Sequence, residues 1–226
     1  MVKKLKKKPL ISLIVIFALA VLVDQLTKQW AYHSLVDEDF RAQTGMYPVC
    51  GDEDQERARS RFVRRHRTGM TVIENVFDLR YVENCASAFG IMGKMPESLR
   101  YPFFLIVSVL AVIVIPYLYR KTPATHRLML YALPFVLGGA VGNLLDRLIY
   151  RYVIDFVDWY VVVDGRDHHW PTFNIADVAI VVGIGLMILQ MLPRKGAGKE
   201  EDSGEEADHP VQGGDEGKQP DAGGSE

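Results

Sequence analysis

Residues 101–119 read "YPFFLIVSVLAVIVIPYLY" and contain no charged side chain. The hydrocarbon core of a bilayer is about 30 Å thick, so a helix needs about 20 mostly apolar residues to cross it. This segment meets that requirement by itself. It therefore predicts a membrane-spanning helix. The remaining apolar blocks are accordingly considered as candidates for further spans.

Three further apolar blocks cover residues 9–23, 128–142 and 175–192. They reach the length of a span only if nearby polar residues are included, namely Asp24, Gln25, Thr27, Lys28, Asn143, Asn174 and Asp177. A surface helix of a soluble protein carries a charged stripe along one face. The four blocks show none, so four buried helices of a soluble all-α protein are the weaker interpretation.

We therefore expect an all-α membrane protein with a small extracytoplasmic β element. Its four transmembrane helices are predicted at about 10–31, 101–119, 128–146 and 174–192.

Loop charges predict the orientation. Residues 1–9 carry five lysines, and the short loop 120–127 is also basic. Short basic loops stay in the cytoplasm, whereas long loops are translocated largely regardless of charge. We expect both termini and loop 120–127 inside, with 33–100 and 147–172 outside.

A cleaved signal peptide is the alternative for the first block, but small residues occur only at mid-block, so an uncleaved span is favoured.

Two segments are too polar to form a core. Residues 37–68 are first acidic and then basic, and we expect a mobile or loosely helical insertion. It could be solvated or could touch anionic lipid head groups. Residues 193–226 are rich in Gly, Glu and Asp and almost devoid of large apolar side chains. Such a composition predicts a disordered acidic cytoplasmic tail.

A strand pattern follows the charged insertion. Phe77, Leu79 and Tyr81 alternate with Asp78, Arg80 and Val82, which predicts β structure within a small element over residues 70–92. Cys50 and Cys85 both fall in this outer loop, in a compartment that permits disulfides. The sequence leaves open whether they form a bridge. Neither has a histidine spacing that suggests a metal site.

Charged and amide side chains stand at the ends of the apolar blocks. Ionisable groups within spans are costly and usually face the interior of a bundle, where they mark function. Asp24 lies about 14 residues into the first block, hence about 21 Å from its start and near the outer surface. Lys28 follows four residues later on the same helical face. The corresponding groups at the outer ends of the third and fourth blocks are Asn143, Asp146, Arg147, Asn174 and Asp177.

Two of these acids lack a clear cationic neighbour in the sequence. Asp24 has Lys28, and Asp146 is followed directly by Arg147, so interfacial ion pairs explain both. Asp155, in the segment that joins the third and fourth spans, and Asp177 have no such partner; Arg151 precedes Asp155 by four residues, on what could be a turn. Two under-neutralised carboxyls at one depth are suited to acid–base chemistry.

The motifs around these residues resemble those of the lipoprotein signal peptidases (signal peptidase II), aspartyl proteases of the bacterial membrane. They occur in the family's order within residues 10–192: "DQLTK" (24–28), "ENCASAFG" (83–90), "GGAVGNLLDRLIYRYVIDFVD" (138–158) and "HWPTFNIADVAI" (169–180). The last two together are highly specific, and the first alone is weak. The family usually shows Asn-x-Gly-Ala-Ala-Phe at 84–89, where this chain has Ala86 and Ser87.

The resemblance implies an activity and a site. The catalytic aspartates are Asp155 and Asp177, and the expected supporting or substrate-binding residues are Asp24, Lys28, Asn84, Asn143, Asp146, Arg147 and Asn174. The implied reaction removes the signal peptide of a lipid-modified prolipoprotein by cutting before a diacylglyceryl-cysteine. The expected setting is the bacterial cytoplasmic (inner) membrane, with surrounding membrane lipids, no nucleic-acid partner, no cofactor or metal, and a monomer.

Two other classes of protein compete with a peptidase. Ion-coupled membrane transporters also keep acids within their spans, usually near the midplane and within inverted repeats. Here the acids cluster near one surface and no repeat is evident. A non-enzymatic lipid-binding membrane subunit is the second alternative, and the two unpartnered acids argue against it.

Overall fold

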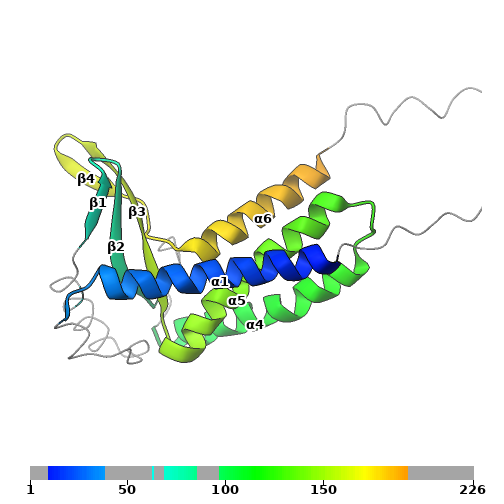
Figure 1. Ribbon diagram of the computed structural model, residues 1–226. Coiled ribbons are helices and arrows are strands. Elements are labelled where there is room, and N and C mark those ends of the chain that lie inside the picture. The colour runs from blue at the N-terminus through cyan, green and yellow to red at the C-terminus, as the bar shows by residue number, and fades with distance from the viewer. Residues whose placement is uncertain (1–9, 39–62, 64–68, 86–96, 193–226) are drawn as a thin grey trace, which may run out of the picture. The chain divides into compact units, whose positions relative to one another are not determined.

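Four helices and a four-stranded sheet make up the described part of the computed structural model, which comprises residues 10–38, 63, 69–85 and 97–192 (Figure 1). The helices are α1 Leu10–Ser34, α4 Glu97–Lys121, α5 Arg127–Tyr150 and α6 Ile175–Met191. The strands are β1 Met70–Ile73, β2 Phe77–Asn84, β3 Val153–Val163 and β4 Arg166–His169. The predicted basic N-terminus and acidic tail, most of the charged insertion, and Ala86 and Ser87 lie outside the described residues.

Three of the helices, α1, α4 from Tyr101 onward, and α5, are long and apolar enough to cross a membrane. The fourth, α6, is equally apolar but has 17 residues. The prediction of a mostly helical membrane protein is confirmed. Several helix ends differ from the predicted bounds by about a turn; α5, for example, continues past Asp146 to Tyr150.

Helix α5 is the centre of the bundle and packs against α1, α4 and α6. Small residues on α5 allow this close packing. A Cβ atom on Gly139 would stand 2.3 Å from the backbone oxygen of Ala176 in α6. A Cβ atom on Gly142 would stand 2.4 Å from Oδ2 of Asp24 in α1. These glycines therefore bring the backbones of three helices close enough for their polar side chains to meet.

The sheet is antiparallel in the order β1-β2-β3-β4 and lies at one end of the helices, here called the sheet end (Figure 1). Strand β2 covers the segment whose alternation predicts a strand, and β3 continues the chain almost directly from α5. Side chains of α1 and the sheet share an aromatic core that includes Tyr32, Tyr81 and Phe156. The sheet is thereby held against the helix ends.

The β3–β4 hairpin lies in the 147–172 connection, for which the sequence analysis predicted a side of the membrane but no strands. The segment "VIDFVDWYVVV" is rich in β-branched and aromatic residues, which favour strands. It ends at Asp164 and Gly165, which have φ angles of 51° and 69°. An Asp-Gly pair with positive φ at both positions is the preferred two-residue hairpin turn.

Candidate active site

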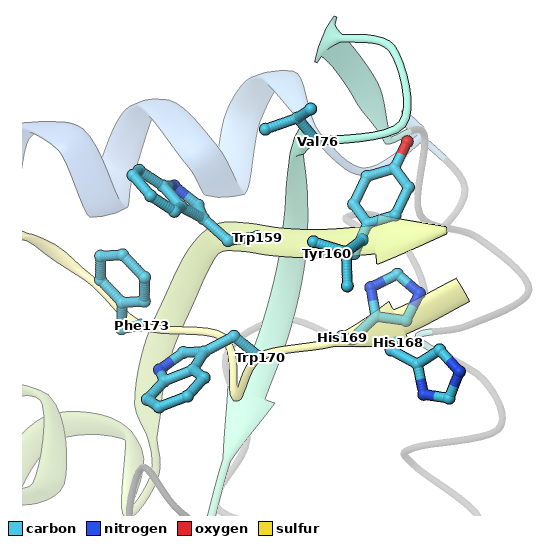
Figure 2. Close-up of a pocket in the computed structure, with 8 residues that line it drawn as sticks. Val76, Trp159, Tyr160, His168, His169, Trp170 and Phe173 are labelled. Carbon is cyan, nitrogen blue, oxygen red and sulfur yellow. The ribbon is translucent and has the colours of Figure 1, made fainter. Parts of the chain in front are cut away.

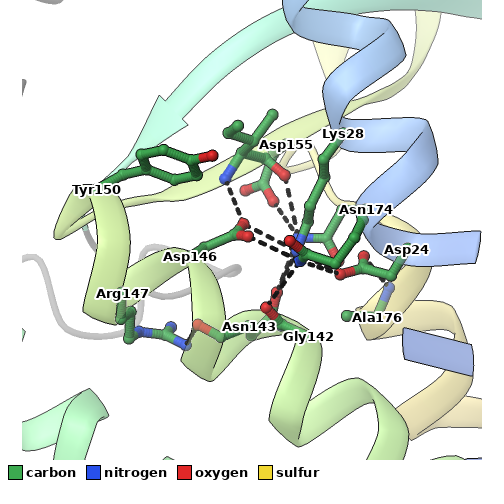
Figure 3. Close-up of polar contacts among 12 residues, drawn as sticks. Asp24, Lys28, Gly142, Asn143, Asp146, Arg147, Tyr150, Asp155, Asn174 and Ala176 are labelled. Atoms are coloured by element: carbon green, nitrogen blue, oxygen red, sulfur yellow. Dashed lines mark hydrogen bonds and ion pairs between the residues drawn. The ribbon is translucent and has the colours of Figure 1, made fainter. Parts of the chain in front are cut away.

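A buried lysine organises the polar centre at the sheet end of the bundle (Figure 3). Lys28 Nζ lies 2.8 Å from Oδ2 of Asp24 and 2.9 Å from Oδ2 of Asp146. It also donates a hydrogen bond of 3.0 Å to Oδ1 of Asn143. All four side chains are buried. One cation is therefore shared by two acids, and it joins α1 to α5.

Asp24 also connects the first helix to the last. Its Oδ1 accepts a hydrogen bond of 2.9 Å from the backbone N–H of Ala176, in the first turn of α6. Backbone N–H groups at a helix start lack partners within the helix, and the helix dipole there favours a negative charge. The Asp24 carboxylate thus gives a hydrogen-bond partner to a backbone N–H group that has none within α6. The same carboxylate forms an ion pair with Lys28.

Gln25 belongs to this centre, although the sequence interpretation did not select it. Its Nε2 lies 3.1 Å from Asp24 Oδ2, 3.0 Å from Asp146 Oδ1 and 3.2 Å from the backbone oxygen of Gly142. An amide at this position bridges two carboxylates that would otherwise repel each other. Its place inside an apolar block, directly after Asp24, was the signal that could have identified it.

Asp146 and Arg147 do not form the local pair that their adjacency suggested. Asp146 Oδ2 accepts from the backbone N–H of Ile154 at 3.1 Å, in addition to its ion pair with Lys28. Arg147 instead donates to the backbone oxygen of Asn143 at 3.1 Å and lies 5.3 Å from the centre of the Phe104 ring. Asp146 therefore ties the start of β3 to the lysine centre, and Arg147 faces α4.

Asp155 is held in β3 by two amide side chains. Nδ2 of Asn84, on the neighbouring strand β2, donates to Asp155 Oδ2 at 2.6 Å. Nδ2 of Asn174 donates to Asp155 Oδ1 at 2.7 Å. Only 1% of Asp155 is exposed. Both carboxyl oxygens are thus oriented within a nearly dry environment.

Asp177 lies in the first turn of α6 and is half-buried. Its Oδ2 accepts from the backbone N–H of Asn174 at 3.2 Å, and the Asn174 side chain accepts from the backbone N–H of Asp177 at 3.1 Å, forming a reciprocal cap. Asn143 Nδ2 donates to Asp177 Oδ1 at 2.9 Å. Hydrogen bonds from the helix start and from Asn143 therefore hold both carboxyl oxygens of Asp177 in place.

A pair of asparagines joins the two acids. Asn174 Nδ2 lies 3.2 Å from Asn143 Oδ1, so one amide oriented toward Asp155 contacts another oriented toward Asp177. Through Asn143 the same chain of hydrogen bonds reaches Lys28. The structure therefore brings all nine sequence-selected residues into one continuous polar cluster with Gln25.

The environment of Asp155 changes its acidity. Burial raises the pKa of its carboxyl from the ordinary 3.8 to about 8, and the charge of Asp177 acts in the same direction. Hydrogen bonds from Asn84 and Asn174 and the charge of Lys28 oppose this rise in pKa. Asp155 consequently keeps its proton at neutral pH. A protonated carboxyl beside an ionisable one is the arrangement that acid–base catalysis requires.

Two apolar cavities lie on either side of Trp170 and Phe173. The first, here called the hairpin pocket, has a volume of about 630 Å³ and is lined by residues that include Trp159 of β3, His168 of β4 and Trp170, which follows β4 (Figure 2). The second, here called the α6 groove, has a volume of about 430 Å³ and is lined by Asp177 and the apolar face of α6. Trp170 and Phe173 line both cavities.

Polar side chains of three strands meet at the hairpin that carries the first cavity. Arg80 of β2 forms an ion pair with the buried Asp158 of β3. His169 Nδ1 of β4 lies 3.1 Å from Asp158 Oδ2.

Cys85, directly after Asn84, is disulfide-bonded, and the chain's other cysteine, Cys50, lies outside the described residues.

Two neighbouring carboxyls in different environments, joined by amides at the end of a bundle of apolar helices, are compatible with an aspartic-type hydrolase. The comparisons agree with that class. The family model described as signal peptidase (SPase) II matches residues 16–193. A lipoprotein signal peptidase of Anaeromyxobacter sp. (strain Fw109-5) is 39% identical over 193 residues, covering 83% of this chain and 87% of that protein. One of Syntrophus aciditrophicus (strain SB) is 32% identical, covering 84% and 97%.

Solved structures agree with the sequence comparisons. A bacterial membrane enzyme determined by the in meso method at 2.3 Å resolution is 25% identical, with a TM-score of 0.58, covering 88% of this chain and 98% of that one. A second, at 1.9 Å resolution, is 27% identical with a TM-score of 0.55, covering 84% and 98%.

The chain belongs to the signal peptidase II family. It is therefore a multi-pass bacterial membrane protein and an aspartic-type signal peptidase that acts on prolipoproteins. Neither a transporter nor a non-enzymatic lipid-binding subunit finds support in the comparisons.

Proposed function

We propose that Asp155 and Asp177 are the catalytic pair, and that they cut the signal peptide from a prolipoprotein just before its diacylglyceryl-modified cysteine. The observation that carries the proposal is the amide bridge between a protonated Asp155 and the helix-capped Asp177. Since one chain supplies both carboxyls, the proposed working unit is a monomer. Asn84, Asn143 and Asn174 orient the pair.

The different surroundings of Asp155 and Asp177 indicate which carboxyl starts as the acid and which as the base. Asp177 takes a proton from a water molecule, and the water oxygen attacks the carbonyl carbon of the scissile bond. Asp155 gives its proton to the carbonyl oxygen, which avoids an oxyanion in this nearly dry site. When the tetrahedral intermediate collapses, the leaving cysteine amine takes a proton from Asp177, and Asp155 recovers its own. The pair titrates as a unit, so the two roles exchange during the cycle.

The test of this function is a cleavage assay with purified protein. Two precursor peptides of the same sequence are compared, one with a diacylglyceryl-cysteine and one with an unmodified cysteine. We expect release of the signal peptide from the lipidated precursor alone, with the new N-terminus at the modified cysteine. Release from neither precursor, or from a bond elsewhere, contradicts the proposal.

We also propose four spans, with both termini in the cytoplasm and the dyad near the outer surface. Helix α6 has 17 residues, at the short end of the range for a span. The lysine-rich start and the basic 120–127 loop support this orientation. A reporter fused after residue 192 should give a cytoplasmic signal, and one inserted near residue 60 should give an outside signal. An outside signal from the C-terminal fusion means an odd number of spans.

The raised pKa of Asp155 predicts how activity depends on pH. Because Asp155 must be protonated to act as the acid, kcat/KM should fall as the pH rises through about 8. The hydrogen bond from Asn84 lowers this pKa, so Asn84→Ala should shift the falling limb to higher pH. The measurement is kcat/KM between pH 5 and pH 10 for both proteins. A profile that stays flat through the alkaline range would show that Asp155 does not hold the working proton.

A further inference from the structure

The last residue of β2 holds the Asp155 carboxyl from the end of a strand pair. Asn84 ends β2 and pairs with Val153, the first residue of β3. Asp155 pairs with Val82, so Asn84 is its diagonal neighbour on the same face of the sheet. Diagonal neighbours lie about 7–8 Å apart along the backbone, and asparagine is a short side chain. The 2.6 Å hydrogen bond from Asn84 to Asp155 therefore depends closely on where the end of β2 lies.

A strand end is the part of a sheet that opens most easily. The pairing of β2 with β3 ends at Asn84 and Val153, so this ladder supports Asn84 from one side only. Local opening costs least free energy where few contacts oppose it. A small displacement there withdraws the Asn84 amide from Asp155. Any restraint on the residue after Asn84 consequently acts on the site.

That next residue, Cys85, is restrained by a covalent bond. It is disulfide-bonded, and the chain has one other cysteine, Cys50. A bridge within the chain therefore joins these two residues. Cys85 also packs against the aromatic core that includes Tyr32 and Tyr81. The residue directly beyond the end of β2 is thus held in two ways.

The charged insertion 37–68, which contains Cys50, has its own contact with the same core. Val63 is only 5% exposed and belongs to the aromatic cluster with Tyr81. Attachment of the insertion to the sheet therefore does not depend on the bridge alone. This leaves the bridge a local role at the end of β2.

We infer that the disulfide at Cys85 positions the site for the reaction, because it holds the end of β2 so that the Asn84 amide stays on Oδ2 of Asp155. Cys85 is a positioning residue, since it acts on Asp155 through Asn84. The inference rests on the proposed function and extends it to the insertion, which supplies the other half of the bridge. The proposed orientation places the sheet on the outer side of the membrane, where disulfides persist.

The titration of Asp155 reports this role. Among the described residues, the charged groups that face Asp155 are Lys28 of α1, Arg147 of α5 and Asp177 of α6. All three lie on helices, so release of the β2 end changes chiefly the hydrogen bond from Asn84. That hydrogen bond lowers the pKa of Asp155, and its loss raises the pKa. The falling limb of kcat/KM should then move to higher pH, in the direction expected for Asn84→Ala.

The experiment breaks the bridge with Cys50→Ser in the full-length protein, which leaves Cys85 and its core contact in place. The quantity measured is kcat/KM for a lipidated precursor between pH 5 and pH 10. The falling limb should move up by about half a pH unit. At neutral pH, kcat/KM should fall about threefold to tenfold, because the site is less well ordered.

Reduction of the folded wild-type protein makes the same comparison without a substitution. Dithiothreitol converts the bridge to two thiols and is itself oxidised to its cyclic disulfide. Treated wild type should show both effects, and treated Cys50→Ser should show no further change. Peptide mapping by mass spectrometry without reductant should find Cys50 and Cys85 in one linked fragment.

Two matched variants separate positioning from general stability. Val63→Ala loosens the packing of the insertion and keeps the bridge, so it should lower the melting temperature without moving the limb. Asn84→Ala combined with Cys50→Ser should have the pH profile of Asn84→Ala alone. The bridge acts through an amide that this double variant no longer has, so the two changes should not add.

A limb that stays in place both in Cys50→Ser and after reduction overturns the inference. So does a further shift when Cys50→Ser is added to Asn84→Ala, or a map in which the two cysteines are not linked. If the wild-type protein cleaves no lipidated precursor, the proposed function fails and this inference fails with it. Wild-type cleavage with an unmoved limb contradicts the inference alone.

Discussion

Asp155→Asn and Asp177→Asn are each expected to lower the cleavage rate by about a thousandfold or more. An amide can neither accept the proton of the attacking water nor give one to the scissile carbonyl, and a positioned acid or base contributes about 10²–10⁴-fold. Each carboxyl acts in both halves of the cycle, so losing either one stops the reaction. The measurement is single-turnover cleavage of a lipidated precursor by purified variants.

The same preparations separate chemistry from folding. Asp177→Asn should melt near the wild-type temperature, because asparagine has the same size and its side-chain oxygen can still accept the capping hydrogen bond from the backbone N–H of Asn174. The matched control is Asp164→Asn in the hairpin turn, where φ is 51° and asparagine is well tolerated. That control should cleave normally. Cleavage near the wild-type rate in Asp155→Asn or Asp177→Asn would remove that residue from the chemistry.

Lys28→Met is expected to produce the largest loss of stability. It leaves Asp24 and Asp146 buried at 0% exposure without their shared cation. Breaking a buried ion pair by removing one partner destabilises a protein by about 3–5 kcal/mol. Since Asp24 also caps α6 and Asp146 also holds β3, cleavage activity should fall together with the melting temperature in detergent.

A charge-free version of the centre is the control for this prediction. The triple variant Lys28→Met, Asp24→Asn, Asp146→Asn contains no unpaired buried charge, so it should recover much of the melting temperature lost in Lys28→Met. Asp146→Ala alone should lower both stability and activity, because Lys28 then keeps only Asp24. If Lys28→Met or Asp146→Ala melts like wild type yet is wholly inactive, that residue belongs to the chemistry.

Helical spacing predicted which polar residues of the first, third and fourth spans share a face, whereas Asn84 and the roles of all nine residues came from the family resemblance. The Asp24–Lys28 pair follows from an i,i+4 relation on one helix, and the apolar runs predicted the membrane helices directly. The partner of Asp146 could not be found in this way. Lys28 lies far away in the chain, and the adjacent Arg147 was misleading because neighbouring residues on a helix do not face each other.

The hairpin was missed for a different reason. Residues 153–163 carry a strand composition, and Asp164-Gly165 is a strong turn signal, but the segment was interpreted only as a connection between two spans. The amide bridge of Asn143 and Asn174 depends on the close approach of α5 and α6 at Gly139, which no local pattern reveals.

The hydrogen bond from Ala176 to Asp24 joins residues 152 positions apart in the chain. The ribosome makes α1 long before α6, so Asp24 and Lys28 enter the bilayer without Asp146 or the last helix. Their mutual pairing at i,i+4 lets α1 insert with its charges already neutralised. Only the arrival of α6, which brings Asp177 and presents its first turn to Asp24, completes the centre. In the proposed mechanism, the chain can therefore cut no substrate before α6 has joined the other helices.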